Sequence, residues 1–136
     1  MMRQATAGAG TALRQAWSNA ILGWTFKEDV PDIRNTRVID IYRELQSYGV
    51  DVSCYDPHAD LVEVKHEYGI ELLSEAPQKG PFDAVILAVK HRALMMRFDR
   101  AALVALGGKQ PPLLIDVKGF LAAVPGATLG LPYWQL

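Results

Sequence analysis

From Ala20 onward, short apolar runs alternate with stretches in which apolar residues recur at helical spacing. The runs over 20–23, 83–89 and 113–117 are typical of buried parallel strands, and alternating side chains over 50–55 predict a strand with one polar face. Helices are predicted over 36–48, 60–68 and 99–106, a brief edge strand over 70–73 and a last strand over 128–131. This order predicts an α/β domain with a mostly parallel sheet and right-handed crossovers.

The helical patterns also predict which side chains face the core. For the helix over 36–48 we expect Asn35 as N-cap and Gly49 just after the C-terminus. Its predicted inward face consists of Val38, Ile41, Tyr42, Leu45 and Tyr48, and that of the helix over 60–68 consists of Leu61, Val64 and Tyr68. The three tryptophans, Trp17, Trp24 and Trp134, are interpreted as packing residues, because no basic groove accompanies them.

Residues 1–19 differ from the rest of the chain. They are rich in Ala, Gly and Thr and follow no clear period, apart from a possible short helix over 11–17. We therefore divide the chain into a leader or non-family segment, 1–19, and one domain, 20–136.

Composition narrows the function classes. The 136 residues, 15.0 kDa, are of single-domain size, and 50% hydrophobic with 21% charged residues is an ordinary globular balance. A net charge of −1 without a basic stripe argues against nucleic-acid partners, and the longest apolar run, 84–89, is too short for a membrane span. No signal peptide is visible, and the single cysteine, Cys54, excludes an internal disulfide, so we expect a cytoplasmic protein.

Charged side chains gather where the first predicted strand ends. Because ligands of open parallel sheets bind at the carboxyl ends of strands, the loop over 23–35 is the first candidate site. Lys27 and Arg34 suit phosphate oxygens, Lys as a point charge and Arg as a fork. Asp32 could instead pair with either of them and brace the loop, and a merely solvated loop remains the alternative.

Other strand-end residues give weaker signals. Asp56 lies where a dinucleotide-binding fold places its ribose-binding acid, but the glycine fingerprint is absent after Gly23, which argues against an NAD-binding half. Cys54 is interpreted as a small buried hydrophobe, and Lys118 follows another strand end and could face the same crevice. His91 follows a strand end and could contact a ligand there, but a solvated loop is the favoured interpretation. His91 lies in a different element from the other two histidines, His58 and His66, and their spacing predicts no metal site.

Several motifs occur in the order found in one known family. The stretch 23–37, Gly-Trp-Thr-Phe-Lys-Glu through Pro-Asp-Ile-Arg-Asn-Thr-Arg, resembles the G-x-x-F-K-x-x-x-x-D-x-R-x-S motif of the UDP-glucose/GDP-mannose dehydrogenase family. The likeness continues through residues 38–40, 55–57, 67–70, 83–89 and 116–119. It covers the chain from about Ala20 onward and points to the C-terminal, nucleotide-sugar-binding domain, most similar to bacterial UDP-N-acetylhexosamine 6-dehydrogenases. The usual apolar lead-in to the first strand is replaced at residues 16–19 by Ala-Trp-Ser-Asn.

The resemblance implies a Rossmann-like three-layer fold with helices on both faces of the sheet. It also implies an NAD-dependent parent enzyme, a homodimer in surface polysaccharide biosynthesis, that oxidises the sugar C6 alcohol of a UDP-N-acetylhexosamine to a carboxylate. NAD would be bound mainly by N-terminal domains that this chain lacks, and neither the catalytic cysteine motif nor any catalytic residue is present, so the chain alone should be inactive. By position, Phe26, Lys27 and Lys118 would contact the UDP-sugar, Arg34 would reach NAD, and Asp32 would support the loop.

Two other functions remain open at this point. The chain could be a stand-alone module that binds a sugar nucleotide without catalysis, or an inert truncated fragment. The expected partners of the parent enzyme are the UDP-sugar and the missing N-terminal domains, with neither nucleic acid nor membrane.

Overall fold

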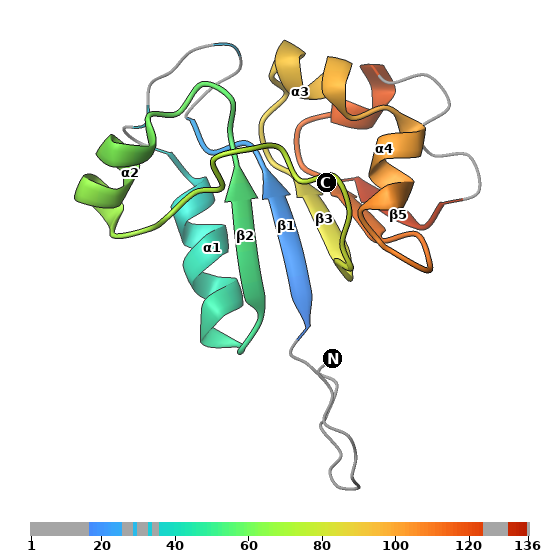
Figure 1. The fold of residues 1–136 in the computed structure, drawn as a ribbon, viewed down its shortest axis with the longest axis horizontal. Helices are drawn as coiled ribbons and strands as arrows, with labels where there is room; N and C mark the ends of the chain where they lie inside the picture. Colours follow the sequence, from blue (N-terminus) through green and yellow to red (C-terminus); the bar gives the residue numbers. More distant parts are fainter. Residues whose placement is uncertain (1–16, 26–28, 30–32, 34–35, 124–130, 136) are drawn as a thin grey trace, which may run out of the picture.

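A five-stranded parallel sheet forms the centre of the fold (Figure 1). The structure is a computed structural model and describes residues 17–25, 29, 33, 36–123 and 131–135. The described elements are β1 (Ser18–Leu22), α1 (Val38–Ser47), β2 (Asp51–Tyr55), α2 (Leu61–Tyr68), β3 (Ala84–Leu87), α3 (Arg92–Arg97), α4 (Arg100–Ala105), β4 (Leu113–Asp116), η1 (Phe120–Ala123) and β5 (Tyr133–Gln135).

All neighbouring strands of this sheet are parallel, in the order β2-β1-β3-β4-β5. The chain thus steps outward from β1 to β2, and then returns past β1 to β3. The strand order reverses between β1 and β3, and in doubly wound sheets such a reversal places the ligand crevice at the carboxyl ends of those strands.

Helices cover both faces of the sheet, because successive side chains of each strand point to opposite faces. On one face, Leu22 and Leu87 pack in a cluster with Leu94 of α3 and Leu103 of α4. On the other face, the core consists of Ile21, Cys54 and Ile86 together with Val38 and Tyr42 of α1 and Val64 of α2. Figure 1 shows the same division, with α1 and α2 on one side of the strands and α3 and α4 on the other. The predicted three-layer α/β fold is confirmed, with a wholly parallel described sheet.

The helix predictions need correction at their ends. Helix α1 begins at Val38, whose backbone N–H donates to the Thr36 hydroxyl at 3.1 Å, whereas the predicted N-cap, Asn35, lies outside the described residues. Tyr48 is 63% exposed and Leu61 is 37% exposed, so neither belongs to the core as predicted. Tyr48 follows the last residue of α1, where the helical spacing no longer fixes the direction of a side chain.

Three further differences concern the predicted strands and loops. Residues 70–73 form no strand; they run beside β2 with one backbone hydrogen bond, from Leu73 to Cys54 at 2.8 Å. Helix α3 forms where no helix is predicted. The last strand is β5, after the predicted range 128–131; residues 128–130 lie outside the described residues, and Trp134 is 64% exposed instead of packed.

The amino-terminal part of the chain is described only from Trp17. The expected helix over 11–17 therefore lies almost wholly outside the described residues. Strand β1 includes Ser18 and Asn19, which precede the proposed boundary at residue 20, and the boundary itself stays a prediction. No described helix is both long and apolar enough to cross a membrane.

Candidate functional site

The described strands end together at one edge of the sheet, which we call the carboxyl edge. Leu22, the last residue of β1, pairs with Tyr55 of β2 and with Leu87 of β3, and Leu87 pairs with Asp116 of β4. Loops that follow these strands therefore emerge side by side. We call residues 23–36, of which 23–25, 29, 33 and 36 are described, the β1 loop.

The β1 loop starts with a close backbone approach at Gly23. Its φ is +109°, and a Cβ at this position would lie 2.7 Å from both the Cβ and the backbone N of Val89, in the turn after β3. Only glycine tolerates both the positive φ and this contact. The loops that follow β1 and β3 are thus pressed together at the reversal point of the sheet.

One buried carboxylate, Asp56 at the end of β2, collects five hydrogen bonds. Its Oδ2 accepts from the backbone N–H of Trp24 at 2.6 Å and of Thr25 at 2.9 Å, and lies 3.1 Å from the Thr25 hydroxyl and 2.9 Å from His91 Nε2. Its Oδ1 accepts from the His58 backbone N–H at 2.7 Å. Burial raises the pKa of Asp56, but the hydrogen bonds from His91, Thr25 and Trp24 outweigh burial and lower this pKa to about 2.

This geometry leaves Asp56 no role as a ribose-binding acid. The residue is 3% exposed, and both of its oxygens are taken by groups of the chain itself. Asp56 therefore anchors the start of the β1 loop and has no free oxygen for a ligand hydroxyl.

His91 is wholly buried between the loops that follow β1, β2 and β3, so the prediction of a solvated loop residue was wrong. Its Nε2 lies 2.7 Å from the Thr25 hydroxyl and 2.9 Å from Asp56 Oδ2, and its Nδ1 accepts from the Asp29 backbone N–H at 2.7 Å. Because an amide can only donate, Nδ1 carries the lone pair. Nε2 therefore carries the proton and donates a hydrogen bond to Asp56. The next residue, Arg92, donates its backbone N–H to Asp29 Oδ1 at 2.7 Å.

The indole of Trp24 anchors the β1 loop on the opposite side, against α1 and α2. It is fully buried and meets the rings of Tyr42 and Tyr68 edge-on, with centroids 6.1 and 5.4 Å apart. Tyr68 donates its hydroxyl to the Ile33 carbonyl at 2.7 Å, and the Thr36 hydroxyl donates to the Trp24 carbonyl. The interpretation of Trp24 as a packing residue is confirmed.

The fold brings two of the three histidines together, although they lie in different elements. The rings of His58 and His91 meet edge-on with centroids 4.6 Å apart, and one donor atom each of Asp29, His58 and His91 lies within 4.8 Å of the others, an arrangement that could hold a cation. Both ring nitrogens of His91 and one carboxylate oxygen of Asp29 are already hydrogen-bonded within the chain. A cation would have to displace at least one of these bonds, so the cluster needs no metal to account for it.

Four of the predicted site residues, Phe26, Lys27, Asp32 and Arg34, lie outside the described residues. The fifth, Lys118, is exposed in the turn after β4, at the carboxyl edge as expected. Asp116 shapes this turn: it is fully buried and accepts from the backbone N–H groups of Lys118 at 3.2 Å, Phe120 at 2.8 Å and Leu121 at 2.8 Å. The contact of Lys118 with a substrate stays a prediction.

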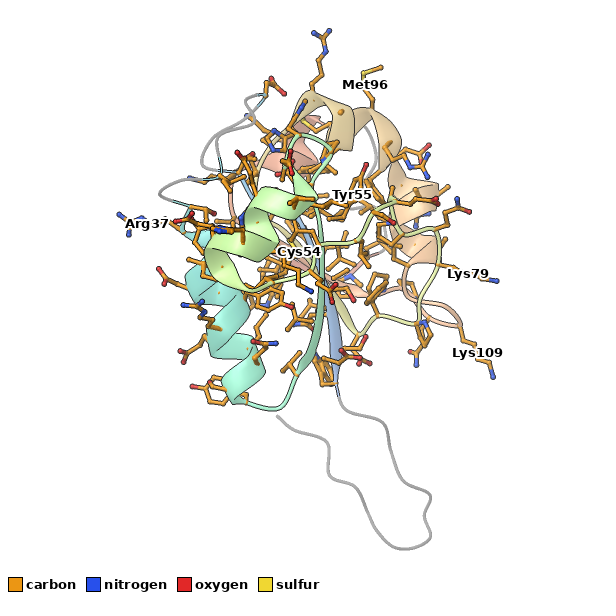
Figure 2. The ribbon with its side chains drawn as sticks, turned by 60° about the vertical axis from the view of Figure 1, so that its left-hand side comes forward. Arg37, Cys54, Tyr55, Lys79, Met96 and Lys109 are labelled. Carbon is orange, nitrogen blue, oxygen red and sulfur yellow. The ribbon has the colours of Figure 1, made fainter. Side chains whose placement is uncertain are left out.

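Cys54 lies on β2, inside the fold (Figure 2). It is 1% exposed, its thiol lies 3.7 Å from the Gly23 carbonyl, and burial raises the pKa of the thiol well above its usual value. The structure confirms the interpretation of Cys54 as a small buried hydrophobe, because a neutral, enclosed thiol is a poor nucleophile.

The profile of the UDP binding domain of the UDP-glucose/GDP-mannose dehydrogenase family matches residues 20–123, which include the whole β1 loop, Asp56 and His91. The chain belongs to this family. The match confirms the resemblance found in the sequence.

Two relatives of this chain are UDP-N-acetyl-D-glucosamine 6-dehydrogenases. The chain is 43% identical over 103 residues to the UDP-N-acetyl-D-glucosamine 6-dehydrogenase of Salmonella typhi, and 46% identical over 101 residues to that of Pseudomonas aeruginosa. These alignments cover 76% and 74% of this chain but only 24% and 23% of the relatives. The chain thus spans about a quarter of the length of the curated relatives that it matches.

A solved structure shares the fold. The UDP-N-acetyl-mannosamine dehydrogenase Cap5O from Staphylococcus aureus superposes with a TM-score of 0.62 at 20% identity, covering 88% of this chain and 26% of that one. At this identity the likeness supports the Rossmann-like α/β architecture.

Proposed function

We propose that this chain is the sugar-nucleotide-binding part of an NAD-dependent UDP-sugar 6-dehydrogenase, and that it takes a UDP-N-acetylhexosamine. The observation that carries the proposal is the anchoring of the β1 loop, the segment with the family motif, at the reversal point of the sheet. Asp56 and His91 hold this loop from one side, and Tyr42 and Tyr68 hold it from the other, against the ring of Trp24. Doubly wound sheets bind ligands at this reversal point, beside the carboxyl ends of the strands.

The chemistry of a UDP-sugar fits the residues that the motif supplies. The diphosphate is an anion, so Lys27 of the β1 loop and Lys118 after β4 are assigned to the phosphates, and Phe26 is assigned to an apolar contact with the nucleotide-sugar. Asp32 is assigned to support of the loop, and Arg34 to a contact with the cofactor of the whole enzyme.

The described residues themselves do not fit an NAD site. Gly23 is followed by the buried residues Trp24 and Thr25 in place of a glycine-rich turn, and the Asp56 carboxylate is fully occupied by the chain. We therefore assign NAD binding and the oxidation of the C6 alcohol to further domains of a longer protein, which would be a cytoplasmic homodimer that serves surface polysaccharide synthesis.

Ligand-observed NMR on this chain tests the proposal. We expect UDP-N-acetylglucosamine to give saturation-transfer signals at a concentration of about 5 mM, since half a site is expected to bind with a Kd of about 1 mM, or about −4 kcal/mol. Lys27→Ala should weaken these signals, because it removes a charge from the diphosphate contact. Lys109→Ala is the matched control, because Lys109 is exposed and precedes β4, at the opposite edge of the sheet (Figure 2).

Three results would count against the proposal. Absence of any signal from the wild-type chain would remove the binding role, and an unchanged signal in Lys27→Ala would remove the assignment of the β1 loop. Equal effects of the two lysine substitutions would indicate nonspecific attraction of the nucleotide.

A further inference from the structure

His91 contacts the β1 loop at two points, on either side of residues 26–28. Its Nε2 lies 2.7 Å from the Thr25 hydroxyl and its Nδ1 lies 2.7 Å from the Asp29 backbone nitrogen. Thr25 directly precedes Phe26, and Asp29 follows Lys27 by two positions. One buried ring therefore holds both ends of the short segment that carries the two residues assigned to the nucleotide.

The two ends of this segment depend on His91 to different degrees. Thr25 is also held by Asp56, through its backbone N–H at 2.9 Å and its hydroxyl at 3.1 Å. Asp29 has no such bond to Asp56 in the described residues; its bonds go to His91 Nδ1 and to the backbone N–H of Arg92. The Asp29 end is thus the one that loses most if the ring is changed.

Asp29 also adopts a backbone conformation that needs outside support. Its φ is +62°, in the left-handed region that residues other than glycine seldom occupy, although Asp tolerates it better than most. Such conformations persist when surrounding contacts fix them, and they are frequent at ligand sites. Here the turn between β3 and α3 supplies both contacts, one to the amide and one to the carboxylate of Asp29.

Asp56 determines which nitrogen of the His91 ring carries the proton. Its Oδ2 accepts a hydrogen bond from Nε2–H, which leaves the lone pair of Nδ1 directed at the Asp29 amide. The carboxylate therefore acts on the far end of the segment through the histidine.

We propose that His91 is a positioning residue for nucleotide-sugar binding: through Nδ1 it fixes Asp29, the described residue that follows Lys27 by two positions. The proposal rests on the function proposed above. It differs from a role in stability alone, because it makes binding depend on one ring nitrogen in particular.

Two substitutions of His91 test the roles of the two ring nitrogens separately. His91→Asn keeps a side-chain oxygen near the position of Nδ1 and so retains an acceptor for the Asp29 amide. His91→Gln keeps an N–H donor near the position of Nε2, toward Asp56, but loses that acceptor. His66→Gln is the matched control, because His66 is an exposed residue of α2.

The experiment measures UDP-N-acetylglucosamine affinity by NMR titration, together with hydrogen exchange of the Asp29 amide and the urea midpoint of each variant. We expect His91→Gln to weaken affinity about tenfold, equivalent to about 1.4 kcal/mol, and to remove the protection of the Asp29 amide. His91→Asn should stay within about twofold of the wild type in affinity and retain that protection, even if its urea midpoint falls as far as that of His91→Gln.

A second measurement needs no variant of His91. Long-range proton–nitrogen NMR correlations of the wild-type ring should show the proton on Nε2, and a proton on Nδ1 would overturn the proposal.

If His91→Gln does not fold, Asp29→Ala replaces it, because the substitution of Asp29 removes the carboxylate that accepts from the Arg92 backbone N–H. Loss of a negative charge would by itself strengthen binding of a diphosphate, so weaker binding of Asp29→Ala supports positioning and unchanged or tighter binding refutes it.

The outcomes separate this proposal from the proposed function. If the wild-type chain does not bind UDP-N-acetylglucosamine, the proposed function fails, and the assignment of His91 to binding fails with it. If the wild-type chain binds and His91→Gln binds equally well, only the positioning role is refuted. Equal weakening in His91→Gln and His91→Asn would also refute it, because both would then act through stability.

Discussion

Replacement of Asp56 by Asn should lower the free energy of unfolding by more than the loss of any single surface contact would. The pKa of Asp56 lies at about 2 in the folded chain against an ordinary value of 3.8, and each unit corresponds to about 1.4 kcal/mol. The ionised carboxylate thus stabilises the folded state by about 2 kcal/mol at neutral pH. In Asp56→Asn the amide group would also face donors that it cannot satisfy, so we expect a loss of about 2–4 kcal/mol in the free energy of unfolding.

The pH dependence gives this prediction a second readout. Because the pKa of Asp56 is lower in the folded state, its contribution is complete above pH 3.8 and is lost as the pH falls through about 2. Urea denaturation followed by circular dichroism should show a large gap between wild type and Asp56→Asn at neutral pH, and the gap should narrow in acid.

The control for this experiment is Asp40→Asn, since Asp40 is an exposed residue of α1. It should stay within about 0.5 kcal/mol of the wild type. An Asp56→Asn chain that is equally close to the wild type, or a gap that is the same at every pH, would refute the role of Asp56 as a charged anchor.

Two further predictions concern the same region of the fold. Gly23→Ala should lower the free energy of unfolding by more than about 2 kcal/mol, because its Cβ would lie 2.7 Å from Val89 at a positive φ. In the control Gly49→Ala no atom lies within 4 Å of the new Cβ, so the loss should be about 1 kcal/mol. Equal losses for the two variants in urea denaturation would contradict this. The Cys54 thiol should react with a thiol reagent such as dithionitrobenzoate only as fast as the chain unfolds, because it is buried and its pKa is raised; rapid labelling of the native chain would contradict its enclosure in the core.

The layers of the fold could be predicted from local patterns. Strand β3 lies within the apolar run 84–89 and strand β4 begins with the apolar run 113–115, and such runs fit a parallel sheet that is covered on both faces. Helix α2 begins one residue after the predicted start at Asp60, which caps it, and is followed by Gly69 in the left-handed conformation typical of that position. These features depend on residues that are neighbours in the sequence, so they can be recognised from one sequence alone.

The anchoring of the site could not be read from the same patterns. His91 stands between Lys90 and Arg92, and two charged neighbours indicate a solvated loop. Its burial results from contacts with Asp56 and Asp29, which are 35 and 62 residues away along the chain. Pairings at such separations follow from strand order, and sequence periodicity carries no information about strand order.

Asp56 shows that the position of a residue can be predicted from sequence where its contacts cannot. The sequence placed an acid at the end of β2, and the structure confirms that place. Its role as an internal acceptor depends on Trp24 and Thr25, whose backbone N–H groups turn toward it at 2.6 and 2.9 Å. The Asp-Pro pair at 56–57 predicts the end of a strand, but it does not indicate which donors the carboxylate meets.

The most direct test of the whole account is a map of UDP-N-acetylglucosamine binding on this chain by amide chemical-shift changes. We predict that the largest changes fall at the carboxyl edge, at Thr25, Asp29 and His91, because the β1 loop would hold the diphosphate there. The opposite edge has its own hollow, of about 630 Å³, lined by residues that include Trp17 and Gly108. Changes confined to that hollow, or no changes at saturating ligand, would contradict the assignment of the β1 loop to the sugar nucleotide.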